Sequence, residues 1–281
     1  MLTITIDWLS VNFKEWTNEA EHFMRTYASS KPTQDTTARF GYSNASVDNN
    51  GVVLQWNPDR ADMGHHVIFS GSALRNIFSG ETVQPQSLLR ACLDAGGLVS
   101  RLDLASDLSG EALDLSRLYK SLEQGANIGT ARTFGQIRSN DNGHTIYIGS
   151  RQSERFMRIY NKAAQTGLTS DYWFRFELEC KGMVARAMAS MLVSQHEWLP
   201  VFVGVCSGML NIPGSPELGP FYNAASAAIG LPKIEKQTDR EKWIAEQVIA
   251  AVARHYIDNP NSEAVARLIA TLQLIDRKRV E

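Results

Sequence analysis

The stretch Arg101-Leu102-Asp103-Leu104-Ala105-Ser106-Asp107-Leu108 decides the fold, because ionisable and apolar residues alternate along it. Successive side chains of a β-strand point to opposite faces of the sheet. One face of this strand therefore carries Arg101, Asp103 and Asp107, and the other carries leucines. The pattern predicts a sheet with one face packed in a core and one face that gathers ionisable groups.

Three later segments, residues 145–149, 158–162 and 174–179, alternate in the same way within strands predicted over residues 144–149, 155–162 and 172–180. Their polar sides carry Thr145, Tyr147, Arg158, Tyr160, Lys162, Arg175, Glu177 and Glu179. If the four strands share one sheet, its polar face brings together acids, bases and two tyrosines.

Strand patterns dominate before residue 180 and helical patterns follow it, at residues 183–193, 201–205, 222–228, 239–256 and 262–275. This order predicts an α+β fold with a central antiparallel sheet, one polar and candidate catalytic face, helices packed on the other face, and a helical C-terminal region. We expect a sheet-based domain over residues 1–185 and a helical region over residues 186–281, which could pack on the same domain.

Composition restricts the class of protein. The 281 residues are 43% hydrophobic and have a net charge of −2, so a nucleic-acid surface would have to be a local basic patch. The cysteines Cys92, Cys180 and Cys206 form no C-x-x-C pair, which disfavours a zinc ribbon or a disulfide framework and fits a reducing cytoplasm. We find no signal peptide and no apolar stretch long enough to span a membrane.

The acids of the polar face suit a divalent cation. Neighbouring carboxylates repel one another unless a cation neutralises them, and Mg²⁺ or Mn²⁺ prefers oxygen ligands and suits phosphoryl chemistry. A nearby tyrosine could act as a nucleophile, with arginine and lysine stabilising the transition-state charge. The alternative is an ordinary solvated sheet face, where cross-strand ion pairs contribute little.

Four parts of the chain together resemble the replication initiation factor family, which covers rolling-circle plasmid initiators, phage replication proteins and relaxases of integrative elements. The parts are Ile6-Asp7-Trp8-Leu9-Ser10-Val11-Asn12-Phe13, residues 101–107, the run Gly143–Ser153 with Arg158-Ile159-Tyr160-Asn161-Lys162, and Trp173-Phe174-Arg175-Phe176-Glu177-Leu178-Glu179. Their order and spacing resemble the family over residues 1 to about 185.

The resemblance implies an enzyme that nicks one DNA strand at an origin, keeps the 5′ phosphate on a tyrosine and leaves a 3′ hydroxyl to prime synthesis. It implies Tyr160 as the nucleophile, with Tyr147 as the second choice, and Mg²⁺ or Mn²⁺ as the cofactor. The remaining roles are metal ligation by Asp103, Glu177, Glu179 and Asp107, catalysis by Arg158 and Lys162, and DNA contacts by Arg151, Arg155, Arg175 and Arg101.

The partners implied are single-stranded or cruciform origin DNA, a host helicase and replication proteins, with a homodimer as a further expectation and no membrane. Two other functions stay open: a metal-dependent nuclease that activates water, and a non-catalytic DNA-binding protein of a phage or plasmid. The sequence Ala163-Ala164-Gln165 follows the tyrosine strand, so a second nucleophile in that segment is not evident.

Two other motifs have simpler explanations. His65 and His66 are adjacent, so they would point to opposite faces of a strand and would not share a metal. Ser70-Gly71-Ser72 could bind a phosphate at a helix start, but helix capping is the more common role. His144, next to a predicted turn, is expected at the surface.

Overall fold

The computed structural model describes residues 2–28, 34–80, 83–110, 112–139, 143–167, 172–225 and 227–232, with residues 252, 255, 257–259 and 262–267 near the C-terminus. The chain divides into two compact units, Met1–Ile234 and Glu235–Glu281. The helix predicted over residues 239–256 lies almost wholly outside the described residues, as does the end of the one predicted over residues 262–275. The domain boundary expected near residue 185 stays a prediction.

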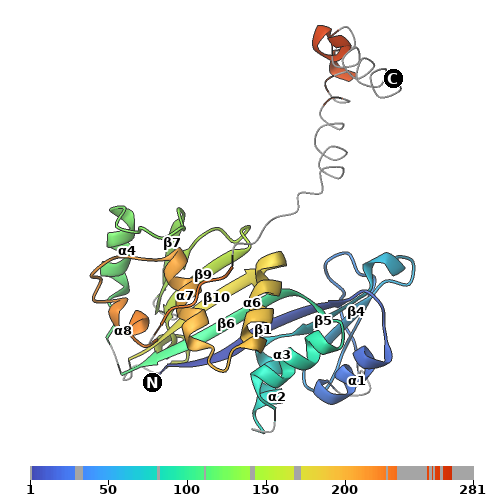
Figure 1. Ribbon diagram of the computed structural model, residues 1–281, viewed down its shortest axis with the longest axis horizontal. Helices are drawn as coiled ribbons and strands as arrows, with labels where there is room; N and C mark the ends of the chain where they lie inside the picture. The colour runs from blue at the N-terminus through green and yellow to red at the C-terminus, as the bar shows by residue number, and fades with distance from the viewer. Residues whose placement is uncertain are drawn as a thin grey trace. The chain divides into compact units, whose positions relative to one another are not determined.

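The first unit is built on a ten-stranded sheet with the order β2-β3-β4-β5-β1-β6-β10-β9-β8-β7, in which each neighbouring pair is antiparallel. The long central strands β1 and β6 cross its middle (Figure 1). The strands are β1 (Thr3–Phe13), β2 (Gln34–Asp35), β3 (Asn44–Val47), β4 (Val53–Trp56), β5 (His65–Phe69), β6 (Leu98–Ser109), β7 (Phe134–Ser139), β8 (Gly143–Ile148), β9 (Arg155–Asn161) and β10 (Trp173–Lys181).

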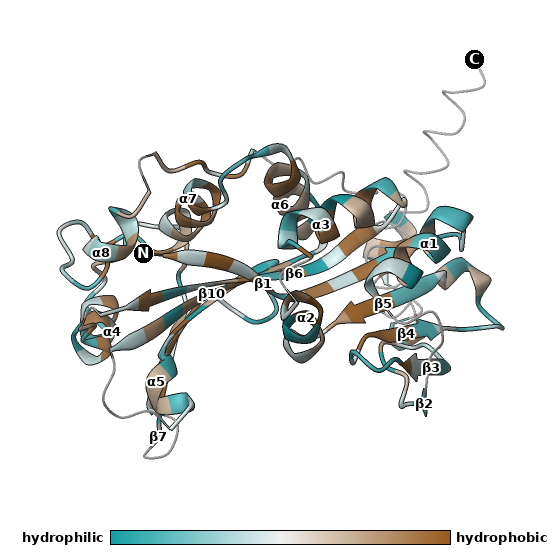
Figure 2. Ribbon diagram, turned by 90° about the horizontal axis from the view of Figure 1, so that it is seen from below, coloured by the Kyte–Doolittle hydropathy of each residue, from teal (hydrophilic) through white to brown (hydrophobic). Residues whose placement is uncertain are grey.

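Helices cover the apolar face of this sheet. Figure 2 shows α3, α6 and α7 together on one side of the strands. The described helices are α1 (Asn18–Tyr27), the 3-10 turn η1 (Ala61–Met63), α2 (Gly71–Phe78), α3 (Pro85–Asp94), α4 (Leu115–Glu123), α5 (Lys162–Gln165), α6 (Gly182–Ser194), α7 (Leu199–Met209) and α8 (Gly219–Tyr222).

The alternation of the strands explains the core. Leu102 and Leu104 of β6 and Phe176 of β10 are fully buried in one cluster with Met188 of α6 and Phe202 of α7. Burying such side chains stabilises a fold by about 1.5–3 kcal/mol each. The predicted α+β class, antiparallel sheet and apolar helix-covered face are confirmed.

Several element boundaries differ from those predicted. The helix expected over residues 222–228 is wrong, because α8 begins at Gly219, has Pro220 in its first turn and ends at Tyr222. Proline at the start of a helix lacks only an N–H that would be unpaired there. The strand expected to reach Lys162 ends at Asn161, whose side chain accepts a hydrogen bond from the Ala164 amide and caps α5.

The N-terminus of α2 is capped by serine, as expected. The Ser70 hydroxyl accepts a hydrogen bond from the Ala73 amide at 3.3 Å. Gly71 allows the helix to approach β1, since a Cβ at this position would lie 3.0 Å from the Asp7 carbonyl oxygen. The close approach places α2 beside the strand that carries Asp7.

No helix in the described part of the chain is long and apolar enough to cross a membrane.

Candidate active site

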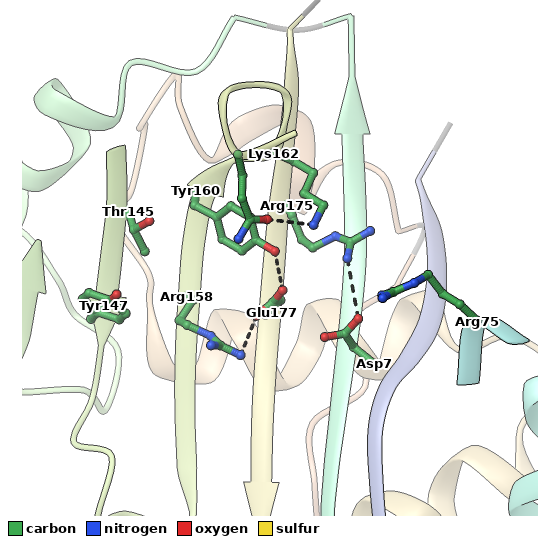
Figure 3. A pocket seen from close by; sticks show the side chains of 10 residues that line it. Asp7, Arg75, Thr145, Tyr147, Arg158, Tyr160, Lys162, Arg175 and Glu177 are labelled. Carbon is green, nitrogen blue, oxygen red and sulfur yellow. Dashed lines mark hydrogen bonds and ion pairs between the residues drawn. The ribbon is translucent and has the colours of Figure 1, made fainter. Parts of the chain in front are cut away.

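A pocket of about 310 Å³ opens on the polar face of the sheet. Six elements contribute to it, namely β1, α2, β8, β9, α5 and β10, so side chains far apart in the sequence converge there (Figure 3). It is lined by Asp7, Arg75, Thr145, Tyr147, Arg158, Tyr160, Lys162, Gln165, Arg175 and Glu177.

Tyr160 and Glu177 are in direct contact in this pocket. The register pairs Tyr160 with Arg175 and Arg158 with Glu177 across β9 and β10. The Tyr160 hydroxyl donates a hydrogen bond to Glu177 Oε1 at 2.5 Å, and Arg158 Nη2 lies 2.6 Å from Glu177 Oε2. One carboxylate therefore accepts from the phenol and pairs with a guanidinium at the same time.

The environment of Tyr160 keeps its phenol protonated. The residue is 7% exposed. Burial raises the pKa of Tyr160 well above its ordinary value, and the charge and hydrogen bond of Glu177 raise it further. To act as a nucleophile this phenol must lose its proton to a base, and Glu177 is already in hydrogen-bonding contact with it.

Arg175 holds two acids at the edge of the pocket. Its Nε and Nη2 donate to the two carboxylate oxygens of Asp107 at 2.6 and 2.7 Å, and its Nη1 lies 3.6 Å from Asp7 Oδ1. Burial lowers the pKa of Arg175, but the hydrogen bonds and charge of Asp107 outweigh it and the pKa lies above its ordinary value. Arg175 therefore stays a cation beside Tyr160.

Lys162 approaches from α5 rather than from the tyrosine strand. Its Nζ donates to Gln165 Oε1 at 2.7 Å and lies 5.7 Å from the centre of the Tyr160 ring. Burial and the charge of Arg175 lower the pKa of Lys162. A lysine with a lowered pKa gives up a proton more readily than an ordinary one.

Two of the predicted metal ligands lie in a second cluster on the same face. Arg101 donates to both oxygens of Asp103 at 2.9 and 2.6 Å and to Glu179 Oε2 at 2.9 Å. Lys181 Nζ lies 2.6 Å from Glu179 Oε1. Burial raises the pKa of Asp103 to about 6 despite Arg101.

The expected acids are therefore divided between two places. Glu177 lies in the pocket, Asp103 and Glu179 share Arg101, and Asp107 is paired with Arg175. Among the residues that the structure describes, no group of three or more His, Cys, Asp or Glu side chains is placed to hold a metal ion.

The predicted DNA contacts are also divided. Arg175 lines the pocket and Arg101 lies over the Trp8 ring, 4.8 Å from its centre. Arg151 is exposed in the turn before β9. Arg155 is in register with Cys180, on the opposite face of the sheet from Tyr160, so it does not join this site. Strand alternation applied to Arg155 would have excluded it.

Tyr147 lines the pocket from β8, where it is in register with Arg158 and stacks on the Phe156 ring at 5.8 Å.

The three histidines considered from the sequence lie where they were expected. His66 contacts Gln55 on one face, His65 packs on Trp16 on the other, and His144 is bonded to Gln136 at the exposed edge.

Three pocket residues, Asp7, Arg75 and Gln165, were not predicted. Asp7 follows Thr3 and Thr5 in the alternation of β1, so the same argument that selected Asp103 could have found it. A register shift between Ile6 and Trp8 marks a β-bulge at Asp7. Arg75 comes from α2, and nothing in its local sequence indicates that this helix lies beside β1.

Comparison with known proteins now assigns part of the chain. Residues 97–214 match the family model described as replication initiation factor. This match agrees with the resemblance that the sequence indicated. The matched residues include Tyr160, Glu177 and Arg175, whereas Asp7 and Arg75 reach the pocket from outside the match.

The fold is also similar to a solved structure, the rolling circle replication initiator protein from Geobacillus stearothermophilus. The TM-score is 0.67 at 20% sequence identity, and the match covers 83% of this chain and 100% of that chain. At this identity the likeness establishes the fold. No match was found among curated protein sequences.

Proposed function

We propose that this chain is a rolling-circle replication initiator that nicks one strand of origin DNA through Tyr160. One observation carries the proposal: the Tyr160 hydroxyl is hydrogen-bonded to Glu177 at 2.5 Å in a pocket lined by four cationic side chains, Arg75, Arg158, Lys162 and Arg175. The match of residues 97–214 to the replication initiation factor model supports it.

In the proposed reaction Tyr160 Oη attacks the phosphorus of the scissile phosphate while its proton passes to Glu177. The bond between phosphorus and the 3′ oxygen breaks, and the strand becomes linked to Tyr160 through its 5′ phosphate. The 3′ oxygen takes a proton from Lys162 and leaves as a hydroxyl group. Attack of a 3′ hydroxyl on the phosphotyrosine reverses these steps and reseals a strand.

The cations give this reaction its electrostatic support. The transition state places additional negative charge on the phosphate oxygens, and preorganised cations in a water-poor site stabilise it. Arg158 is held by Glu177 and Arg175 by Asp107, so both guanidinium groups are positioned before DNA arrives. A side chain held in place loses less entropy in the reaction than a free one.

The family resemblance implies a divalent metal, Mg²⁺ or Mn²⁺, with Asp103, Glu177, Glu179 and Asp107 as candidate ligands. The donors are of the type these ions prefer. Their arrangement does not fit a single three-acid site, because Arg101 already bonds Asp103 and Glu179 and Arg158 pairs with Glu177. The residues that bind the metal stay a prediction.

Trapping the covalent product tests the proposal. The protein is incubated with a random-sequence library of 5′-labelled and 3′-labelled single-stranded oligonucleotides and Mn²⁺, and adducts are separated on a denaturing gel and sequenced. We expect an adduct that retains the 3′ label and disappears with Tyr160→Phe. Free 5′-phosphate ends without an adduct would instead support hydrolysis by activated water, and no cleavage at all would support a non-catalytic DNA-binding protein.

The host helicase, the homodimer and a cruciform form of the origin stay predictions from the family resemblance.

A further inference from the structure

A second group of aromatic side chains lies on the same face of the sheet, about β5 and the loop before β3. His66 of β5 is buried and hydrogen-bonds Gln55 at 3.0 Å. The Tyr42 ring stacks on His66 with 5.6 Å between centres, and the Phe40 ring meets it edge-on at 5.5 Å. Burial lowers the pKa of His66 to about 4, so the ring is a neutral support for the other two near pH 7.

Phe40 is held in an unusual position. Among the residues that the structure describes it alone, glycines aside, has a positive φ, of 60°. Large side chains rarely adopt this backbone, and such strain is concentrated at functional sites. Its side chain is nevertheless 70% exposed. The Tyr42 amide donates to the Arg39 carbonyl at 3.2 Å, so Phe40 and Gly41, both with positive φ, are the central residues of a tight turn that leaves Phe40 exposed to solvent.

This group is continuous with the pocket through β1. Asp7 lines the pocket, the next residue Trp8 lies under Arg101, and Asn12 donates to the Tyr42 hydroxyl at 3.4 Å. Asn12 is in register with His66, so Trp8, Asn12 and His66 share the polar face. The five residue steps from Asp7 to Asn12 span about 17 Å along a strand, the length of a few nucleotides. Figure 2 shows β1 extending along β6 toward β5 and β4.

We propose that Phe40, Tyr42 and Trp8 form a base-stacking strip that binds single-stranded DNA next to the nicking pocket. The inference rests on the proposed function, because that function brings a DNA strand to Tyr160. Stacking platforms for single strands combine aromatic rings with cations along the backbone path. Here Arg101 lies over Trp8, and Arg39 is exposed directly before Phe40.

Single-stranded DNA suits this surface better than a protein partner. Phe40 and Tyr42 lie together about His66, Trp8 lies apart from them on β1, and polar groups accompany the rings, including Ser10, which accepts from the Trp8 indole at 2.7 Å. Every base has an aromatic face, so such a strip would bind bases with little regard to sequence. It would hold the DNA next to the cut without determining where the cut is made.

Equilibrium binding of fluorescein-labelled oligo-dT tests the strip without requiring cleavage or a known origin. The full chain is titrated against oligo-dT and against a duplex of equal length, and fluorescence anisotropy is measured. We expect Phe40→Ala to weaken oligo-dT binding about tenfold and to leave duplex binding unchanged. Phe40→Tyr keeps an aromatic ring and should bind oligo-dT as the wild type does. The matched control is Tyr172→Ala, which removes an aromatic ring that is 59% exposed and outside the strip.

Thermal melting distinguishes a structural role of Phe40 from a role in DNA binding. Asparagine adopts the left-handed backbone more readily than phenylalanine, so Phe40→Asn should melt at the same temperature as the wild type or higher while losing oligo-dT binding. Equal oligo-dT affinity for wild type, Phe40→Ala and Tyr172→Ala would overturn the strip, as would a wild type that does not bind oligo-dT. Adduct formation at Tyr160 is a separate measurement, so failure of the strip and failure of the nicking proposal are distinguishable.

Discussion

The Tyr160 hydroxyl lies 2.5 Å from Glu177 Oε1, and the same carboxylate is 2.6 Å from Arg158 Nη2 through its other oxygen. The three side chains come from neighbouring strands in a register fixed by β9 and β10. A phenol, a base and a cation are thus held together by backbone hydrogen bonds rather than by a loop.

Glu177→Gln tests the proposed base. The amide keeps the size of the side chain but cannot take the phenol proton, so adduct formation should fall roughly 10²- to 10⁴-fold. The rate is measured in single-turnover assays with the trapped oligonucleotide. Glu123→Gln, an exposed acid of α4, is the control and should leave the rate unchanged. A Glu177→Gln rate within a few fold of the wild type would exclude this base.

Arg175→Lys tests the anchoring of Asp107. Lysine keeps the charge but cannot form two parallel hydrogen bonds, and both partners are largely buried. We expect a loss of about 1–3 kcal/mol in the free energy of unfolding, measured by urea denaturation, together with slower nicking.

Arg60→Lys is the matched control for Arg175→Lys. Arg60 makes the same two-bond contact to Asp62 at 2.8 Å for each bond, but on an exposed turn. Exposed pairs contribute about 0–1 kcal/mol, so this change should have little effect. Equal effects of the two substitutions would contradict a special role for the Arg175 pair.

The pKa of Asp103 predicts how stability depends on pH. Burial raises the pKa from 3.8 to about 6, so between these values the folded state binds more protons than the unfolded state. The contribution of Asp103 to stability is therefore greatest below pH 4 and is lost as the pH rises through 6. Asp103→Asn, which does not ionise, should gain on the order of 1 kcal/mol relative to the wild type between pH 4 and 7. A stability difference that does not change with pH, measured by urea denaturation, would contradict the raised pKa.

Metal removal tests the cofactor implied by the family. We expect EDTA to abolish adduct formation and Mg²⁺ or Mn²⁺ to restore it, with DNA binding largely retained. If Asp103 and Glu179 bind the ion, it must compete with Arg101, and Arg101→Gln should then lower the Mn²⁺ concentration needed for half-maximal rate. An unchanged or higher requirement would remove these two acids from the ligand set.

Much of the fold and of the site follows from strand alternation. It correctly predicted that Tyr160, Arg158, Arg175 and Glu177 share a face, because a buried apolar side leaves no freedom in register. The apolar partners of these residues, such as Ile159 and Phe176, are fully buried.

Strand alternation could not predict the distances between side chains that share a face. It placed Asp103 with Glu177 on one face, but the structure gives each acid its own arginine. Arg75 reaches the pocket from α2, and its position depends on tertiary packing that the local sequence does not encode. Lys162, which alternation placed on this face, reaches the pocket from α5 rather than from the strand.

Peptide mapping of the covalent adduct tests the central claim most directly. The trapped protein is digested with trypsin and nuclease, and mass spectrometry locates the residue that retains the nucleotide phosphate. We predict that the phosphate is on Tyr160, in the peptide that follows Arg158. A phosphate on Tyr147 or on another residue, or cleaved DNA with no modified peptide, would contradict the account.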